Sequence, residues 1–542
     1  MKAKILILSL IGCIATSIIS AQSLSLIPLP QSVETGEGEF VFKDKLVAQI
    51  TPQAKEVFDL FAKDFSRATD IKIKQIQKSS KAQLELDLVA SLPAEGYTLK
   101  VTKEKISIAA SQPAGFFYAL QTLKQLLPRN VMAGVPDSSV RRWSIPCVEI
   151  EDAPRFAWRG FMLDEGRHFF GKEAVKRVID VMAAYKMNRF HWHLTEDQGW
   201  RIEIKKYPLL TKIGSLREQT TTGHNEGLDG IPYGGYYTQD DIKEIVKYAE
   251  ERFITIVPEI EIPGHSLGAL SAYPWLGCEG EKGNYKTWAY WGVSKQIACA
   301  GRETTFEFWE NVLKEVIELF PGEYIHIGGD EAPRDMWKEC PDCQKRIKDN
   351  NLKNEAELQS YVNNRIEKFL NDHGRKMIGW DEILEGGISQ NATVMSWRGT
   401  EGGIAAAKKG NNVIMTPSSY CYLDYRQTTD RKDELDSNGS YVPLRKSYSF
   451  NPYDQLAPEE HKYIMGVQGN LWTEYITTPM QLQYKALPRL GAIAEIGWSN
   501  PSPETKDVEE FIGRAKELAR YYNVFGWNFG RHFYEDGVQV GW

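Results

Sequence analysis

The 542-residue chain lacks several features that would place it in a specialised class of protein. It has no excess of positive charge: 65 Lys and Arg stand against 72 Asp and Glu, for a net charge of −7, which argues against a nucleic-acid partner. Beyond the N-terminal segment, no apolar run is long enough to cross a membrane. With 42% hydrophobic and 25% charged residues and no low-complexity tract, the composition excludes a disordered or fibrous chain.

Cysteine is scarce, with seven in the chain, and Cys13 lies in the N-terminal apolar segment. Cys278 and Cys299 bracket a loop rich in Gly, Trp and Tyr, and we expect a disulfide between them. Cys340-Pro-Asp-Cys343 fits either a tight disulfide or one half of a zinc site. Because the chain has no second Cys-x-x-Cys pair, zinc is the weaker interpretation, and we predict neither a metal nor a cofactor.

The N-terminal segment is typical of a secretory signal. Residues 1–4 contain two lysines, residues 5–19 are mostly apolar, and Ser20 and Ala21 are the small residues before a cleavage site that we place after Ala21. We therefore expect a protein exported to the periplasm or the cell exterior, without stable membrane insertion. The alternatives are a transmembrane anchor made by the same run and a lipid attached to Cys13.

After the signal at 1–21, the pattern of the chain changes once and predicts two domains, 22–152 and 153–542. The first part has short β-prone runs at 40–50, 83–89, 97–101 and 106–109, with amphipathic stretches at 53–68 and 114–127. These features predict a small α/β domain of a sheet and helices.

In the second part, a short apolar run recurs eight times and is usually followed by a helical pattern. The runs lie at 158–163, 189–194, 254–257, 324–327, 376–379, 393–395, 413–415 and 463–467, with helical patterns at 172–186, 238–251, 305–320 and 355–373. Eight strand–helix units over about 350 residues predict an α/β fold, a (β/α)8 TIM barrel with inserted loops. An open doubly wound sheet is the alternative, and the lack of a glycine-rich phosphate loop after the first strand weighs against it.

The residues that follow these runs are of the types found in catalytic sites. In a barrel, the segments after the strands line the mouth, and here all eight carry acidic, basic or aromatic side chains. Carboxylates and Arg can bind sugar hydroxyls, and aromatic rings can pack against the apolar face of a pyranose. Asp330 and Glu331 are adjacent, so they need not face each other across a sugar as the ordinary retaining mechanism requires.

A metal-dependent barrel hydrolase is the first competing interpretation. His191-Trp-His193 puts two histidines on one face of a strand end, and His265, His326 and Asp330 could complete a metal site. For His191 and His193 we favour packed, hydrogen-bonded side chains.

From His326 to Glu331 the chain reads His-Ile-Gly-Gly-Asp-Glu, and here it resembles the family 20 glycoside hydrolases, the β-N-acetylhexosaminidases. Several independent motifs in one order carry the resemblance, which covers about residues 23–510 and includes the small N-terminal domain. The further motifs are Asp164-Glu-Gly-Arg-His-Phe-Phe170, His191-Trp-His-Leu-Thr-Glu-Asp-Gln-Gly-Trp-Arg201, Pro258-Glu-Ile-Glu-Ile-Pro-Gly-His265 and Leu471-Trp-Thr-Glu474.

The resemblance implies an exo-acting, retaining β-N-acetylhexosaminidase that removes terminal non-reducing GlcNAc or GalNAc from glycans. In this mechanism the substrate's 2-acetamido oxygen attacks the anomeric carbon and forms an oxazolinium intermediate. The resemblance makes Glu331 the general acid and later the base, and Asp330 the group that orients the acetamido nitrogen. Tyr422 would align the acetamido oxygen, and His265 with Glu196 would lie behind Glu331.

Substrate contacts follow from the same resemblance. Trp380, Trp397 and Trp472 would wall the acetamido pocket, and three polar side chains would hold the ring hydroxyls, namely Arg167, Asp424 and Glu474. A non-catalytic amino-sugar-binding protein is the second competing interpretation, and the intact acid pair argues against it.

Two further expectations concern the acids and the assembly. The family commonly has Asp where this chain has Glu196, so the longer side chain could shift the contact with His265. The resemblance also implies that Glu331 is buried beside the charge of Asp330. The carbohydrate substrate is the one partner predicted, without a particular oligomeric state.

Overall fold

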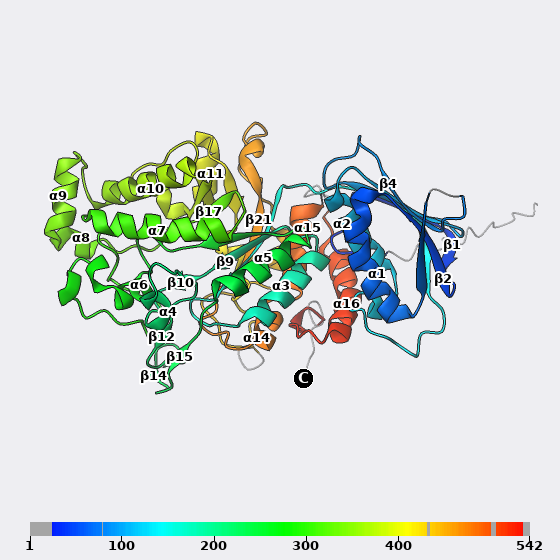
Figure 1. Ribbon diagram of the computed structural model, residues 1–542, viewed down its shortest axis with the longest axis horizontal. Coiled ribbons are helices and arrows are strands. Elements are labelled where there is room, and N and C mark those ends of the chain that lie inside the picture. The colour runs from blue at the N-terminus through cyan, green and yellow to red at the C-terminus, as the bar shows by residue number, and fades with distance from the viewer. Residues whose placement is uncertain (1–23, 78–79, 431–433, 500–505, 535–542) are drawn as a thin grey trace, which may run out of the picture.

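The computed structural model describes residues 24–77, 80–430, 434–499 and 506–534. The signal predicted at 1–21 and the lipid site at Cys13 lie outside these ranges. The two domains lie next to each other along the long axis of the molecule, with the larger second domain on the left in Figure 1. Within the described ranges, no helix combines the length and apolar character that a membrane span requires.

The first domain is a seven-stranded mixed sheet with two helices on the face that looks toward the second domain (Figure 1). The strand order is β1-β7-β5-β6-β4-β2-β3. The strands are β1 (Ser32–Val41), β2 (Lys45–Ile50), β3 (Lys72–Ile76), β4 (Leu84–Leu88), β5 (Tyr97–Val101), β6 (Ile106–Ala110) and β7 (Ser144–Asp152), and the helices are α1 (Lys55–Thr69) and α2 (Pro113–Leu126).

The small α/β domain is confirmed, with differences in its sheet. The run predicted at 40–50 is two strands, β1 and β2, which are separated by residues 42–44. Strands β3 and β7 were not predicted. Strand β3 is a short edge strand with mostly exposed or half-exposed side chains, so it lacks the apolar signal of a buried strand. In β7, Pro146 and three acidic residues dilute the same signal.

The second domain is a closed barrel of eight parallel strands, as predicted, which excludes the open doubly wound sheet. Each of the eight apolar runs is a strand. They are β8 (Trp158–Asp164), β9 (Arg189–His193), β16 (Thr255–Glu259), β17 (Tyr324–His326), β18 (Lys376–Trp380), β19 (Thr393–Ser396), β20 (Val413–Met415) and β21 (Ile464–Leu471).

Helices surround the barrel and occupy its inserts. The four predicted helical patterns are helices, and each matches its predicted range to within two residues: α3 (Lys172–Ala184), α5 (Gln239–Glu250), α7 (Glu303–Leu319) and α10 (Glu355–Asp372). The others used below are α6 (Leu267–Ala272), α8 (Asp335–Glu339), α9 (Pro341–Asp349), α11 (Glu401–Lys409), α14 (Pro479–Ala486), α15 (Arg489–Trp498) and α16 (Val508–Phe525). Helices α8 and α9 lie at the end of the molecule farthest from the first domain (Figure 1).

Helices α15 and α16 lie where the two domains meet (Figure 1). Arg514 of α16 donates to both carboxylate oxygens of Glu495 on α15, at 2.7 Å each, and to the carbonyl of Leu26 at 2.7 Å. The Tyr521 hydroxyl, also on α16, donates to the carbonyl of Gln125 on α2 at 2.9 Å. One helix near the end of the described chain therefore binds the first domain to the barrel.

The disulfide predicted between Cys278 and Cys299 is wrong, because all six described cysteines carry free thiols. The Cys299 sulfur lies 3.8 Å from that of Cys340 and 3.7 Å from that of Cys343, while the Cys278 sulfur lies 4.0 Å from that of Cys343. The fold brings four thiols together instead of two.

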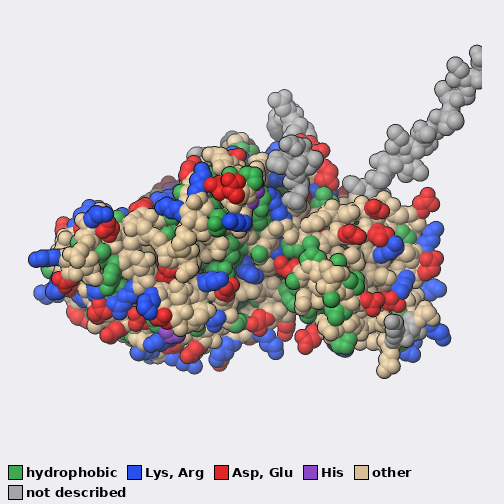
Figure 2. All heavy atoms as spheres, turned by 90° about the horizontal axis from the view of Figure 1, so that it is seen from above, with side chains coloured by type: hydrophobic (Ala, Val, Ile, Leu, Met, Phe, Trp, Pro, Cys, Tyr) green, Lys and Arg blue, Asp and Glu red, His purple; other side chains and the backbone are tan. Residues whose placement is uncertain are grey.

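Charged side chains of both signs are interspersed over the face seen in Figure 2. No broad area of one sign covers this face, in keeping with the near balance of acidic and basic residues.

Candidate active site

Four neighbouring strands of the barrel bring their polar ends into register. Asp164 at the end of β8 pairs with His193 of β9, His193 with Glu259 of β16, and Glu259 with His326 of β17. Because parallel strands end at one edge of a barrel, these four side chains form a layer at its mouth. All four are fully buried.

The two histidines of β9 are packed and hydrogen-bonded, as favoured above. His191 Nδ1 lies 3.0 Å from the side-chain amide nitrogen of Gln468, and its Nε2 lies 2.8 Å from Glu259. His193 lies 3.1 Å from Asp164 through Nδ1 and 3.2 Å from Glu261 through Nε2. Each ring nitrogen of the two histidines therefore lies within 3.2 Å of a polar side chain.

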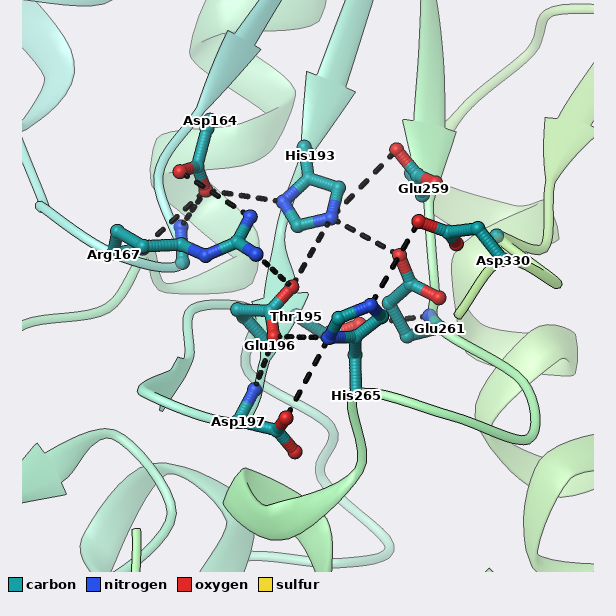
Figure 3. Close-up of polar contacts among 12 residues, drawn as sticks. Asp164, Arg167, His193, Thr195, Glu196, Asp197, Glu259, Glu261, His265 and Asp330 are labelled. Carbon is teal, nitrogen blue, oxygen red and sulfur yellow. Dashed lines mark hydrogen bonds and ion pairs between the residues drawn. The ribbon is translucent and has the colours of Figure 1, made fainter. Parts of the chain in front are cut away.

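His265 lies between Glu196 and Asp197 on one side and Asp330 on the other (Figure 3). Its Nδ1 is 2.7 Å from Glu196 and 3.5 Å from Asp197, and its Nε2 is 3.7 Å from both Asp330 and Glu331. The longer Glu196 side chain therefore keeps the contact with His265.

Charge holds the His265 ring in its protonated form. Burial lowers its pKa, but the negative charges of Glu196 and Asp197 outweigh this effect and raise the pKa of His265 well above its usual range. Glu196 also lies 3.2 Å from the guanidinium of Arg167, and although burial raises the pKa of Glu196, Arg167 and His265 together hold it below its usual value.

The adjacent acids Asp330 and Glu331 follow β17 after two glycines in the left-handed region, Gly328 at φ +67° and Gly329 at φ +89°. A Cβ on Gly328 would lie 1.8 Å from a carboxylate oxygen of Glu261, so only glycine fits this turn. Glu331 and His265 themselves have positive φ, +43° and +46°. Such backbone in residues other than glycine is uncommon and gathers at functional sites.

The two acids have different surroundings. Asp330 is buried, and its Oδ1 has no hydrogen-bond partner among the described residues. Burial raises the pKa of Asp330 well above its usual range, and the charge of Glu261 adds to this effect, while His265 opposes it. The predicted burial of Glu331 is wrong: 41% of its side chain is exposed.

Aromatic rings from three further strand ends form a wall beside these acids. Trp397 and Tyr422 are nearly parallel, at 11°, with ring centroids 6.0 Å apart, and Trp472 lies 6.2 Å from Tyr422. The guanidinium of Arg167 lies 5.0 Å from the Trp472 ring. The structure therefore joins four predicted binding residues into one surface.

Trp380 differs from the other two tryptophans. It is fully buried in a cluster of barrel-core side chains, and its indole N–H donates to Glu259 at 2.8 Å. Trp472 packs against it with ring centroids 5.8 Å apart. In this structure Trp380 supports the wall from behind and has no exposed surface of its own.

Asp424 and Glu474 are two further buried acids, close to each other. Neither oxygen of Asp424 has a hydrogen-bond partner among the described residues. Burial raises the pKa of Asp424, and the charge of Glu474 adds to it. Glu474 accepts one hydrogen bond, from Asn438 at 3.0 Å. Carboxylate oxygens without partners in a buried place suit the hydroxyl groups of a ligand.

Several residues of the site were given no individual role from the sequence. Asp197, Glu261 and Glu382 are among the polar residues that the sequence places at strand ends, without a role of their own. Glu382 follows β18 and accepts from the Trp397 indole at 2.9 Å; burial and the charge of Asp330 raise its pKa to about 8. Asn438 comes from an insert whose shape the sequence does not reveal.

Comparisons with known proteins identify the family of the chain. A family model described as glycosyl hydrolase family 20, catalytic domain, matches residues 156–501, and one described as glycosyl hydrolase family 20, domain 2, matches residues 23–153. A curated β-hexosaminidase from Porphyromonas gingivalis is 44% identical over 515 residues. The match covers 94% of this chain and 64% of that protein, so the chain spans slightly less than two thirds of the relative's length.

Two solved structures are also similar to this chain. A family 20 exo-β-N-acetylglucosaminidase from Vibrio harveyi, in complex with N-acetylglucosamine, has a TM-score of 0.83 and 32% identity, covering 94% of this chain and 78% of that chain. A β-N-acetylhexosaminidase from Bacteroides fragilis has a TM-score of 0.79 and 32% identity, covering 95% and 99%.

Proposed function

Because the chain belongs to glycosyl hydrolase family 20, we propose that it is an exo-acting β-N-acetylhexosaminidase that works by substrate-assisted catalysis. One observation carries the mechanism: buried Asp330 has an oxygen without a partner beside the exposed carboxyl of Glu331. One acid is placed to bind a polar group of the substrate, and the other to exchange protons with it.

In the first step, the acetamido oxygen of the substrate attacks the anomeric carbon, and the bond to the leaving group breaks. Glu331 donates its proton to the departing glycosidic oxygen. Asp330 accepts a hydrogen bond from the acetamido N–H, which gains positive charge as the oxazolinium ring closes.

The raised pKa of Asp330 fits this role. A carboxylate that is poorly stabilised in the free protein gains more when a positive charge develops beside it, so its interaction is stronger in the transition state than in the ground state. Tyr422 and Trp397 would confine the acetamido group of the substrate. The Tyr422 hydroxyl would donate a hydrogen bond to the acetamido oxygen.

In the second step, Glu331 as carboxylate removes a proton from water, which opens the oxazolinium ring at the anomeric carbon. Two inversions at this carbon give net retention. His265 lies 3.7 Å from both acids. Arg167, Asp424 and Glu474 would bind the ring hydroxyls.

A paired assay tests the proposal. The p-nitrophenyl β-glycoside of N-acetylglucosamine and the matching β-glucoside, which lacks the acetamido group, are each assayed with and without EDTA. We expect hydrolysis of the acetamido sugar alone, unchanged by EDTA, and tight inhibition by a thiazoline analogue of the oxazolinium. Comparable rates on both sugars would reveal a protein nucleophile, and loss of activity with EDTA would favour the metal-dependent hydrolase.

Export is a further part of the proposal. It rests on the charged, apolar and small-residue pattern of residues 1–21. Cell fractionation and mass spectrometry of the N-terminus should recover a periplasmic or extracellular chain that begins at Gln22. A lipid-modified Cys13 at the N-terminus would instead establish a membrane anchor.

A further inference from the structure

Four cysteine sulfurs from three separate segments of the chain meet at the end of the barrel domain that carries α8 and α9. Cys278 and Cys299 lie in the insert after β16, and Cys340 and Cys343 lie in the insert after β17. The four sulfurs all lie within 4.8 Å of one another. Cys299, Cys340 and Cys343 are buried and Cys278 is half-buried.

The spacing of these sulfurs matches a metal site and not a disulfide. Three of the sulfur–sulfur distances are 3.7, 3.8 and 4.0 Å. A tetrahedral zinc ion with Zn–S bonds of about 2.3 Å separates its sulfur ligands by about 3.8 Å, whereas a disulfide bond is about 2.05 Å long. We propose that Cys278, Cys299, Cys340 and Cys343 bind one structural zinc ion.

The local backbone suits a negatively charged centre. Cys340 is the N-cap residue of α9, and Cys343 lies in its first turn. The positive end of a helix dipole stabilises negative charge there. Zinc binding would release the four thiol protons and leave a negatively charged centre.

Arg302 places a positive charge beside this centre. Its guanidinium donates to the carbonyl of Cys278 at 2.9 Å and to that of Gly277 at 2.9 Å, and it lies 2.7 Å from Asp342 between the two cysteines of α9. A Cβ on Gly301 would lie 2.2 Å from the backbone of Asp342, so the loop after Cys299 is pressed closely against the turn that carries Cys340 and Cys343.

The zinc ion would join the insert after β16, which carries His265, to the insert after β17, which carries Asp330 and Glu331. Ala298, next to Cys299, donates to the carbonyl of Pro263, two residues before His265, at 3.1 Å. Trp337, between Glu331 and Cys340, donates through its indole N–H to the carbonyl of Ala298 at 2.9 Å. With four sulfur ligands the ion has no open position for substrate, so its role is structural.

Metal analysis of the whole protein tests the proposal. The chain is purified with a Strep tag, because a polyhistidine tag binds zinc, and is then passed through metal-free buffer. We expect about one zinc ion per chain by mass spectrometry, with X-ray absorption showing four sulfur neighbours at about 2.3 Å. Because the ion is buried, brief EDTA treatment should leave it in place, in agreement with the assay proposed above.

Cys343→Ser and Cys299→Ser should each lower the zinc content at least about tenfold, since each removes one of four ligands. Cys147→Ser is the matched control: this cysteine is also buried but lies on β7 in the first domain, and the variant should keep its zinc. Should a ligand variant fail to fold, the zinc content and absorption spectrum of the unmodified chain decide the question.

Two results would overturn the proposal. A zinc-free protein in which all six cysteines from Cys147 to Cys421 react as thiols after unfolding would mean a cluster of plain thiols. A zinc-free protein with only two reactive thiols would mean that the four have paired as two disulfides. Neither result would affect the proposed hydrolase, because no cysteine takes part in its chemistry.

Discussion

At the scale of single residues, the two adjacent acids differ in their surroundings, and the roles proposed for them rest on this difference. Asp330 is buried with a partnerless oxygen, and Glu331 is partly exposed. Neither property follows from residue type, and a one-residue step along the chain separates them. The proposed roles therefore make different demands on the two side chains, and a substitution can test each.

Glu331→Gln should remove the proton donor and keep the shape of the side chain. We expect kcat/KM for an unactivated disaccharide substrate to fall about 10²–10⁴-fold, with a much smaller loss for the p-nitrophenyl glycoside, whose leaving group needs little protonation. Glu318→Gln, at an exposed position on α7, serves as the control. Equal losses on both substrates would count against Glu331 as the general acid.

Glu382 should make the stability of the protein depend on pH. Burial and the charge of Asp330 raise its pKa from 4.5 to about 8, so the folded protein holds a proton that the unfolded chain releases above pH 4.5. The contribution of Glu382 to the free energy of unfolding is therefore largest below about pH 4.5. It is lost as the pH rises toward 8, and the loss is on the order of a few kcal/mol.

Thermal melts of wild type and Glu382→Gln between pH 5 and 9 measure this effect. Glutamine can still accept from the Trp397 indole but does not titrate, so we expect the wild-type melting temperature to fall more steeply over this range than that of the variant. Parallel curves for the two proteins would assign the dependence to other groups, such as His265, whose raised pKa also implies a loss of stability at alkaline pH.

At the scale of secondary-structure elements, the turn after β17 determines where both acids lie. Gly328→Ala would force a Cβ to within 1.8 Å of a Glu261 oxygen at a positive φ, so the turn must move. We expect kcat to fall at least about tenfold, since small displacements of catalytic groups are costly. Gly374→Ala is a matched control, with φ +72° and nothing within 4 Å of the added Cβ.

The control separates backbone strain from displacement of the acids. Gly374→Ala should cost about 1 kcal/mol of stability from its left-handed backbone and leave kcat unchanged. Circular dichroism melts and steady-state kinetics on both variants give the two quantities. If Gly328→Ala kept full activity, the acids would not depend on the geometry of this turn.

Strong local patterns made the barrel predictable. All eight strands are buried apolar runs, and the type of residue at their ends indicated which edge carries the chemistry. The polar edge strand β3 and the acid-rich strand β7 were missed because they lack such a run. The exposure of Glu331 and the hydrogen bond from Asn438 to Glu474 depend on loop conformations. The four cysteines come together through contacts between distant inserts. Spacing along the chain encodes neither.

At the scale of the whole molecule, the buried pair of Arg514 and Glu495 lies in the barrel domain and contacts the first domain through the backbone of Leu26 and Leu29. Arg514→Ala would leave the Glu495 carboxylate, 1% exposed, without its cation, so we expect a loss of about 3–5 kcal/mol. Arg520→Ala is the control on the same helix: its side chain is 55% exposed and pairs with Glu517, and removing it should cost less than about 1 kcal/mol.

Scanning calorimetry should show the Arg514→Ala transition shifted to lower temperature, while Arg520→Ala stays close to wild type. Because α16 contacts both domains, we expect the first domain and the barrel to unfold at lower temperature together. A shift no larger than that of the control would mean that the contact between the domains does not depend on this pair.

The position of α16 also has a consequence for how the protein is made. Arg514 bonds to the backbone of Leu26, 488 residues earlier in the chain, and the first domain is therefore synthesised long before its partner helix exists. A ribosome would need at least about 25 s to cover this distance at 5–20 residues per second. During that interval the apolar surface that α16 later covers is open to chaperones, so the contact between the domains closes only after α16 has been translated.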